Sequence, residues 1–193
     1  MRVIATVGLP GSGKSEAAAV ARELGVPVVT MGDVIRAECR DRGLDPATHH
    51  GEVAKALRAE QGPGAIAERS LPIIEARIAE TDTETVLVDG IRSDTEVDRF
   101  EDAFGKAFSL LSIEAPFDVR AERVAARGRD TPTEDGGESL EERDARERGF
   151  GMDDAIARAD YTISNTDSLA AFRERIETVL RAGPEAVADR TRS

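Results

Sequence analysis

The chain is short of several residue types that would point to particular classes of protein. It has no tryptophan, one tyrosine and a single cysteine, Cys39, among 193 residues. A lone cysteine cannot form an internal disulfide, which favours a reducing compartment. No apolar run approaches the length of a membrane span, and Gly8, Pro10 and Lys14 interrupt the apolar start too early for a signal peptide. We therefore expect a cytoplasmic protein that does not enter a membrane.

Basic residues, and lysine above all, are also in deficit. Only Lys14, Lys55 and Lys106 are lysines, and 38 acidic side chains outnumber 26 basic ones, which gives a formal net charge of −12. A surface of this sign repels the phosphates of nucleic acids, so no nucleic-acid partner is expected. An acid excess with few lysines is typical of a high-salt cytoplasm, although GC-rich coding would also favour arginine.

Apolar segments of strand length alternate with segments of helical pattern along most of the chain. This alternation predicts an α/β fold of the P-loop NTPase type, with a five-stranded parallel sheet covered by helices on both faces. Strands are expected at 3–7, 26–30, 85–89, 108–113 and 161–164. Helices are expected at 14–24, 33–42, 52–61, 65–79, 95–104, 117–127 and 169–181.

Two stretches interrupt the alternation within what we expect to be a single domain, residues 1–182. Residues 31–80 carry helical patterns but no strand signal, which predicts a helical insertion that Pro72 kinks or breaks. Residues 128–138 are polar and include a Gly-Gly pair, so 128–142 is a candidate lid. Residues 183–193 are polar and are expected to form a flexible tail.

The segment GLPGSGKS, at residues 8–15, has the spacing of a P-loop between an expected strand and an expected helix. Glycines let successive backbone N–H groups approach a phosphate, and the helix directs its positive end to the same anion. Lys14 would add a cation for the β and γ phosphates, and Ser15 a hydroxyl for Mg²⁺. We therefore predict that ATP with Mg²⁺ binds here, through Gly8, Leu9, Pro10, Gly11, Ser12, Gly13, Lys14 and Ser15.

Two further candidates follow the strand expected at 85–89. Asp89 ends the run VLVD, at the carboxyl end of the strand, where ligands of open α/β sheets gather, and it could hold Mg²⁺ directly or through water. Arg92, in DGIRS, could clamp a phosphate bidentately. An ordinary strand-end aspartate and a surface arginine are the competing interpretations.

Taken together, the P-loop, TMGDVIR and DGIR resemble the nucleoside monophosphate kinases, adenylate kinase among them. The resemblance places Asp33 and Arg36 beside the phosphoryl acceptor. It also matches Asp89, Gly90 and Arg92 to the family's DGFPR-like motif, with one residue fewer.

The second half of the chain extends this resemblance. RVAARGR resembles the entry to the kinase lid, which implies that Arg123 lies near the ATP base and Arg127 near the transferring phosphate, while LEERD makes Arg143 a second phosphate clamp. The ending ADYTISNTDSL resembles dephospho-coenzyme A kinases, with Asn165 near the adenine. The overall similarity is to a group of archaeal kinase-like proteins related to both families.

The arginines also have a simpler interpretation. Arg120, Arg123 and Arg127 share one face of a helix and could form solvated ion pairs with acids nearby in sequence, namely Glu122, Asp130, Glu134 and Asp135.

These features predict an ATP-dependent kinase with a small nucleotide-like acceptor. A nucleoside monophosphate is already anionic, so Arg36 and Arg92 would bind it and no base would be needed. A hydroxyl acceptor, as in dephospho-coenzyme A, would need a base, for which Asp33 is the candidate. Asp33 could instead only cap the helix beginning GDVIR. A nucleotide-responsive regulatory ATPase is a third possibility.

The charge balance makes a prediction about salt. With a formal charge of −12, self-repulsion opposes the folded state, and added salt screens that repulsion. We expect the Tm, measured by circular dichroism, to rise from low to high KCl. A Tm that stays flat or falls over that range would contradict the high-salt interpretation.

Overall fold

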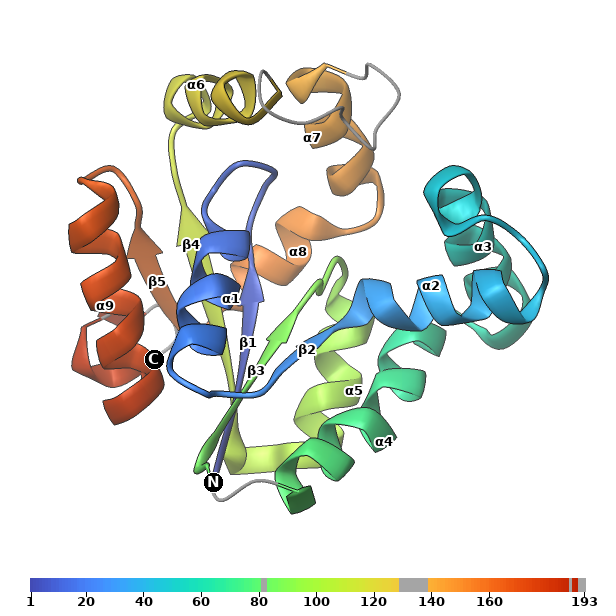
Figure 1. Cartoon of the computed structure of the whole chain (residues 1–193), viewed down its shortest axis with the longest axis horizontal. Helices are drawn as coiled ribbons and strands as arrows, with labels where there is room; N and C mark the ends of the chain where they lie inside the picture. Colours follow the sequence, from blue (N-terminus) through green and yellow to red (C-terminus); the bar gives the residue numbers. More distant parts are fainter. Residues whose placement is uncertain (81–82, 129–138, 188, 191–193) are drawn as a thin grey trace.

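A six-stranded sheet forms the centre of the computed structural model, which describes residues 1–80, 83–128, 139–187 and 189–190 (Figure 1). The strand order is β2-β3-β1-β4-β5-β6. The strands are β1 (Arg2–Val7), β2 (Val28–Thr30), β3 (Thr85–Asp89), β4 (Phe108–Glu114), β5 (Tyr161–Ser164) and β6 (Asp189–Arg190). The first five are parallel, as predicted.

The sixth strand was not predicted. β6 pairs antiparallel with β5, and a short 3₁₀ helix, Pro184–Ala186, precedes it. Both lie in the segment where a flexible tail was expected, of which 188 and 191–193 are outside the described residues.

Helices cover both faces of the sheet. They are α1 (Lys14–Glu23), α2 (Met31–Asp41), α3 (Pro46–Gln61), α4 (Ala65–Glu80), α5 (Asp94–Phe104), α6 (Phe117–Gly128), α7 (Leu140–Gly149), α8 (Met152–Ala157) and α9 (Leu169–Ala182). A further 3₁₀ turn, Gly105–Ala107, joins α5 to β4. No helix in the described ranges is long and apolar enough to cross a membrane.

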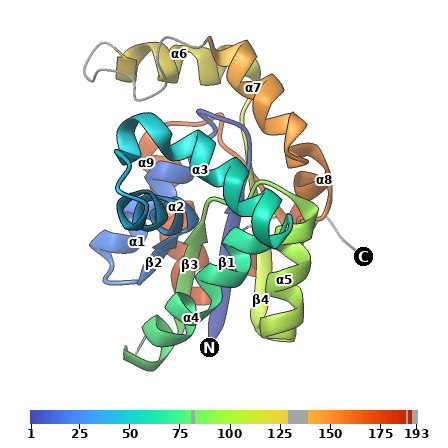
Figure 2. The same cartoon turned by 90° about the vertical axis from the view of Figure 1, so that its right-hand side faces the viewer.

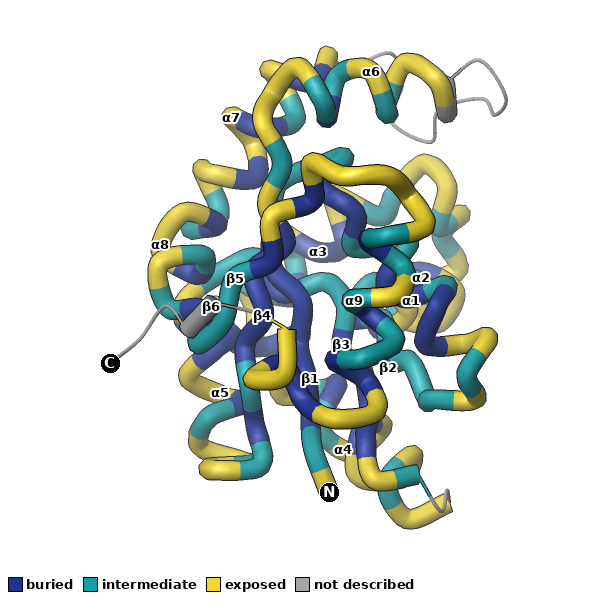
Figure 3. The backbone as a smooth tube through the Cα atoms, turned by 90° about the vertical axis from the view of Figure 1, so that its left-hand side faces the viewer, coloured by how far each residue is buried: buried dark blue, intermediate teal, exposed yellow. Residues whose placement is uncertain are grey.

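Alternate residues of the central strand β1 supply two separate cores. Val3, Ala5 and Val7 belong to a core that includes side chains of α2, α3, α4, α5 and α8. Ile4 points to the other face and packs with apolar residues of α1 and α9. Figure 1 shows these two sets of helices on opposite sides of the sheet, and Figure 3 shows the central strands as almost continuously buried.

The helical insertion expected at 31–80 consists of α2, α3 and α4, with two differences from the prediction. First, α3 begins at Pro46 rather than at residue 52, because the Asp45 side chain accepts a hydrogen bond from Ala47 N at 3.0 Å and proline favours the first helical position. Second, Pro72 does not break the helix, because α4 continues through it. Ile66 and Ile74, on either side of Pro72, are buried in the same core, and this packing maintains the helix.

The chain after β4 also departs from the expected outline. Ser139 and Glu142 form a capping box at the start of α7. The short helix α8 was not predicted; it is fixed by burial of Met152 and Ala155. Most of the candidate lid, residues 129–138, lies outside the described residues.

Two leucines, one buried and one exposed, test whether burial in the core determines the stability of the fold. Leu111 is fully buried in β4, whereas Leu169 on α9 is 61% exposed. Leu111→Ala should lower the free energy of unfolding by about 2–5 kcal/mol because it leaves a cavity. Leu169→Ala should change it by no more than about 0.5 kcal/mol. Urea unfolding at one fixed KCl concentration measures both, and equal losses would contradict the burial pattern.

Candidate functional site

The carboxyl ends of the parallel strands bring the candidate residues to one edge of the sheet. In the registers of neighbouring strands, Thr6 of β1 lies opposite Asp89 of β3, and Asp89 lies opposite Thr30 of β2. The loop after β1, the DGIR segment after β3 and the start of α2 therefore lie together. In Figure 2, α6 and α7 cross above this edge.

The loop between β1 and α1 requires glycine where neighbouring groups pack against it. Gly13 has a φ of 124°, and a Cβ there would lie 2.4 Å from Nδ2 of Asn165. At Gly8, with a φ of 150°, a Cβ would lie 2.4 Å from the carbonyl oxygen of Ile113. Both positions exclude a side chain because the loop is seated on β4 and on the segment after β5.

The ammonium of Lys14 interacts with the charges of several other candidate site residues. Its Nζ donates hydrogen bonds to the carbonyl oxygens of Gly8, at 2.5 Å, and Leu9, at 3.2 Å. Burial lowers the pKa of the Lys14 ammonium to about 8, although the nearby charges of Asp89 and Glu147 act in the opposite direction. Arg92 and Arg120 are also close enough to lower this pKa. The charges of two carboxylates and two guanidinium groups thus act on one ammonium.

Ser12 provides a test of whether the loop fits a phosphate. Its side chain is buried, and its Oγ has no hydrogen-bond partner among the described residues. Buried hydroxyls are normally satisfied, so this atom has a donor to offer inside a loop whose backbone N–H groups favour anions. The loop therefore fits a group that carries several acceptor oxygens.

The two candidate metal ligands lie on adjacent elements. Asp89 ends β3, where its Oδ1 accepts a hydrogen bond from Oγ1 of Thr6 at 3.2 Å. Ser15 is the second residue of α1 and is exposed. In the parts of the chain that the structure describes, no three His, Cys, Asp or Glu side chains form a metal-binding cluster. One carboxylate and one hydroxyl fit Mg²⁺, which retains several waters and takes few protein ligands.

Arg120 is a site residue whose role the sequence did not reveal. Its guanidinium donates to Oδ1 and Oδ2 of Asp144, at 2.8 and 2.7 Å, and both side chains are about 95% buried, with 4% and 5% exposure. It also donates to the carbonyl oxygens of Pro10, at 3.0 Å, and Ala115, at 3.2 Å. The solvated-ion-pair interpretation is therefore wrong for Arg120: its partner is buried and 24 residues away.

Arg123 and Asn165 are brought together behind the same loop. Nη2 of Arg123 donates to the backbone oxygen and Oδ1 of Asn165, at 3.0 and 3.2 Å. Nδ2 of Asn165 donates to the carbonyl oxygen of Ser12 at 2.7 Å. Nη1 of Arg123 is buried without a hydrogen-bond partner among the described residues, so it can still serve a ligand.

The other two arginines of the candidate lid, Arg127 and Arg143, lie on α6 and α7. Arg127 lies in the last turn of α6, and its side chain is outside the description. Arg143 lies in the first turn of α7 and is half-buried.

Asp33 and Arg36 lie on the first turns of α2. Oδ1 of Asp33 accepts hydrogen bonds from Nε and Nη2 of Arg36, at 2.9 and 2.6 Å, and the Asp33 side chain is 64% exposed. The helix-cap interpretation of Asp33 is wrong, because the N-cap is Thr30 and Asp33 is the third residue of the helix. A Cβ on Gly90 would lie 3.2 Å from Cβ of Met31, so the DGIR loop packs against this end of α2.

Arg92 has partners that the sequence did not indicate. Its Nη1 donates to Oε1 of Glu147 on α7 at 2.7 Å, and Nη2 of Arg146 is 3.6 Å from the same oxygen. Its backbone N–H donates to Oε2 of Glu96 at 2.8 Å. Glu96 is fully buried and also accepts from Nη2 of Arg58 at 3.0 Å.

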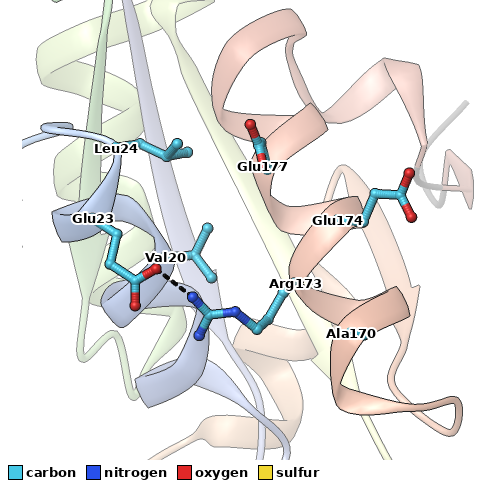
Figure 4. Close-up of a pocket in the computed structure, with 7 residues that line it drawn as sticks. All are labelled: Val20, Glu23, Leu24, Ala170, Arg173, Glu174 and Glu177. Atoms are coloured by element: carbon cyan, nitrogen blue, oxygen red, sulfur yellow. Dashed lines mark hydrogen bonds and ion pairs between the residues drawn. The ribbon is translucent and has the colours of Figure 1, made fainter.

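A hollow of about 330 Å³ lies elsewhere, between α1 and α9 (Figure 4). It involves the C-terminal end of α1, whereas Lys14 begins that helix. Arg173 in its wall is already paired with Glu16 and Glu23. We therefore assign no part of the site to this hollow, which is lined by Val20, Glu23, Leu24, Ala170, Arg173, Glu174 and Glu177.

Comparison with known proteins is consistent with this geometry. The family described as AAA domain matches residues 7–141. A UPF0200 protein of Halobacterium salinarum is 62% identical over 182 residues, which cover 94% of each chain. The crystal structure of TT1252 from Thermus thermophilus is similar with a TM-score of 0.60 and 25% identity, over 93% of this chain and 96% of that one.

A gluconokinase from Sinorhizobium meliloti shares the fold, with a TM-score of 0.56 and 18% identity, over 96% of this chain and 94% of that one. The fold is thus that of the P-loop kinases. The chain belongs to the UPF0200 family and carries an AAA domain over residues 7–141.

Proposed function

We propose that the protein is an ATP-dependent phosphotransferase whose acceptor is a small nucleotide-like molecule, in the first place a nucleoside monophosphate. The observation that carries this proposal is the surroundings of Lys14: a glycine-rich loop with an unsatisfied buried hydroxyl, a strand-end carboxylate at Asp89, and Arg92 on the adjacent loop.

Phosphoryl transfer requires alignment, neutralisation of charge and exclusion of water more than covalent participation by the protein. The backbone N–H groups of residues 8–15 and the Lys14 ammonium would hold and neutralise the phosphates of ATP. Ser15 and Asp89 would hold Mg²⁺, which when bound supplies further positive charge to the phosphate oxygens. Arg127 and Arg143 would complete the charge neutralisation from the lid side, and Arg123 would face the base.

The acceptor would bind between the insertion helices and the DGIR loop, with Arg36 and Arg92 as its phosphate ligands. A phosphate acceptor needs no general base, which suits Asp33: its carboxylate is largely exposed and already accepts two hydrogen bonds from Arg36. The two hydrogen bonds hold this carboxylate against Arg36 on its own helix, which disfavours the dephospho-coenzyme A-type alternative.

A screen with labelled ATP tests the proposal. Nucleoside monophosphates, dephospho-coenzyme A and gluconate would each be added with Mg²⁺, and labelled products separated. We expect strong stimulation by one nucleoside monophosphate. Turnover with only a hydroxyl acceptor would support the alternative kinase, and sustained ATP hydrolysis that no acceptor stimulates would support the regulatory ATPase.

The lowered pKa of Lys14 yields a prediction about protons. With a pKa of about 8 in the free protein, roughly half of the Lys14 side chains are neutral at pH 8. Bound phosphates would raise this pKa, so ATP binding near pH 8 should take up as much as about half a proton, and ATP affinity should fall as the pH rises through 8 to 9. Calorimetric titration in buffers of different ionisation enthalpy measures this uptake.

The matched control is Lys14→Ala. It should bind ATP more weakly, lose turnover and show no proton uptake in this range. Equal proton uptake by a folded Lys14→Ala variant would exclude Lys14 as the group that titrates, and unchanged turnover would exclude the site.

A further inference from the structure

Glu147 is a buried carboxylate beside Arg92, in the site proposed for phosphoryl transfer. Its side chain is only 6% exposed, and its charge is close enough to Lys14 to raise the pKa of that ammonium. Nη1 of Arg92 and Nη2 of Arg146 converge on its Oε1, at 2.7 and 3.6 Å. Two guanidinium groups directed at one anionic oxygen are the arrangement with which proteins bind phosphate.

The backbone and the side chain of Arg92 are held by different partners, so the side chain can change its partner while the backbone stays fixed. The backbone N–H is held by Glu96, which is fully buried and anchored in turn by Arg58. The side chain is 38% exposed, and its contact with Glu147 joins the DGIR loop to α7. A ligand can therefore take over the guanidinium of Arg92 without disturbing the loop.

We propose that Glu147 is an internal substitute for the acceptor's phosphate and thereby a specificity-determining residue. The inference rests on the proposed function, because it assigns an acceptor class to the same site. Glu147 holds Arg92 in its binding position until an acceptor phosphate displaces the carboxylate.

The charges around Glu147 explain why this exchange selects a phosphate. A phosphate dianion can replace a carboxylate on Arg92, and Arg146 remains beside Glu147 to balance its buried charge. A neutral hydroxyl compound brings no negative charge to Arg92, and withdrawing Arg92 from the buried Glu147 carboxylate without an anion to receive its guanidinium is costly. The site should therefore favour phosphorylated acceptors over neutral ones.

Binding of inorganic phosphate tests this competition without ATP. Calorimetric titration at constant ionic strength would compare the wild type with Glu147→Gln, Arg92→Ala and the double variant. Glu147→Gln removes the competing charge and should tighten phosphate binding on the order of tenfold, within the range usual for coupled sites. Arg92→Ala should weaken binding, and the gain from Glu147→Gln should vanish in the double variant.

Glu141→Gln is the matched control, because it removes the same charge from an exposed position on the same helix. An equal gain from Glu141→Gln would reduce the effect to net charge and overturn the inference. So would a Glu147→Gln variant that binds phosphate no better than the wild type. If Glu147→Gln does not fold, Arg92→Ala decides the question: phosphate affinity equal to that of the wild type overturns the proposal.

The acceptor screen and the phosphate titration can fail independently. If no acceptor in the screen is phosphorylated but the phosphate titrations of the wild type and variants give the expected affinities, the kinase proposal is contradicted. Glu147 then remains a competitor at an anion site. If an acceptor is phosphorylated but Glu147→Gln does not change the affinity for phosphate, the kinase proposal stands and the role of Glu147 is removed.

Discussion

The buried ion pair between Arg120 and Asp144 is the interaction on which the site depends. One guanidinium on α6 is bonded to the carbonyl of Pro10 in the phosphate loop, to Ala115 after β4 and to the carboxylate of Asp144 on α7. Removing either partner of a buried pair leaves an uncompensated charge in a medium of low dielectric constant, which is strongly destabilising. The shape of the phosphate loop and the position of α7 are therefore fixed by the same contact.

The position of α7 in turn determines the electrostatics around Lys14. Asp144 and Glu147 are three residues apart on α7, so they lie on one face of the helix. When Asp144 is bound to Arg120, that face is directed at the edge of the sheet, and Glu147 meets Arg92 while its charge reaches Lys14. The helix is thus a second wall of the site, joined to the phosphate loop through Arg120.

Local patterns were sufficient to predict the parts of this structure that local chemistry decides. Five parallel strands and the phosphate loop follow from periodicity and from the spacing of glycine, lysine and serine. The partners of the arginines could not be predicted, because tertiary packing brings together residues as far apart as Arg92 and Glu147, 55 positions in sequence. For the same reason, core packing maintains α4 through Pro72, where local propensity alone predicts a kink or a break.

The most direct test of this account is the affinity for MgATP after Asp144→Asn, with Asp153→Asn as the matched control. Asp153 makes an exposed ion pair with Arg148 at 3.3 Å, so the control breaks a surface pair by the same chemical change. Calorimetric titration of the folded proteins should show MgATP binding weakened by about tenfold or more in Asp144→Asn, because the phosphate loop loses its alignment, and near wild-type binding in Asp153→Asn. A folded Asp144→Asn protein that binds MgATP as tightly as the wild type would contradict the claim that this buried pair holds the phosphate loop in its binding shape.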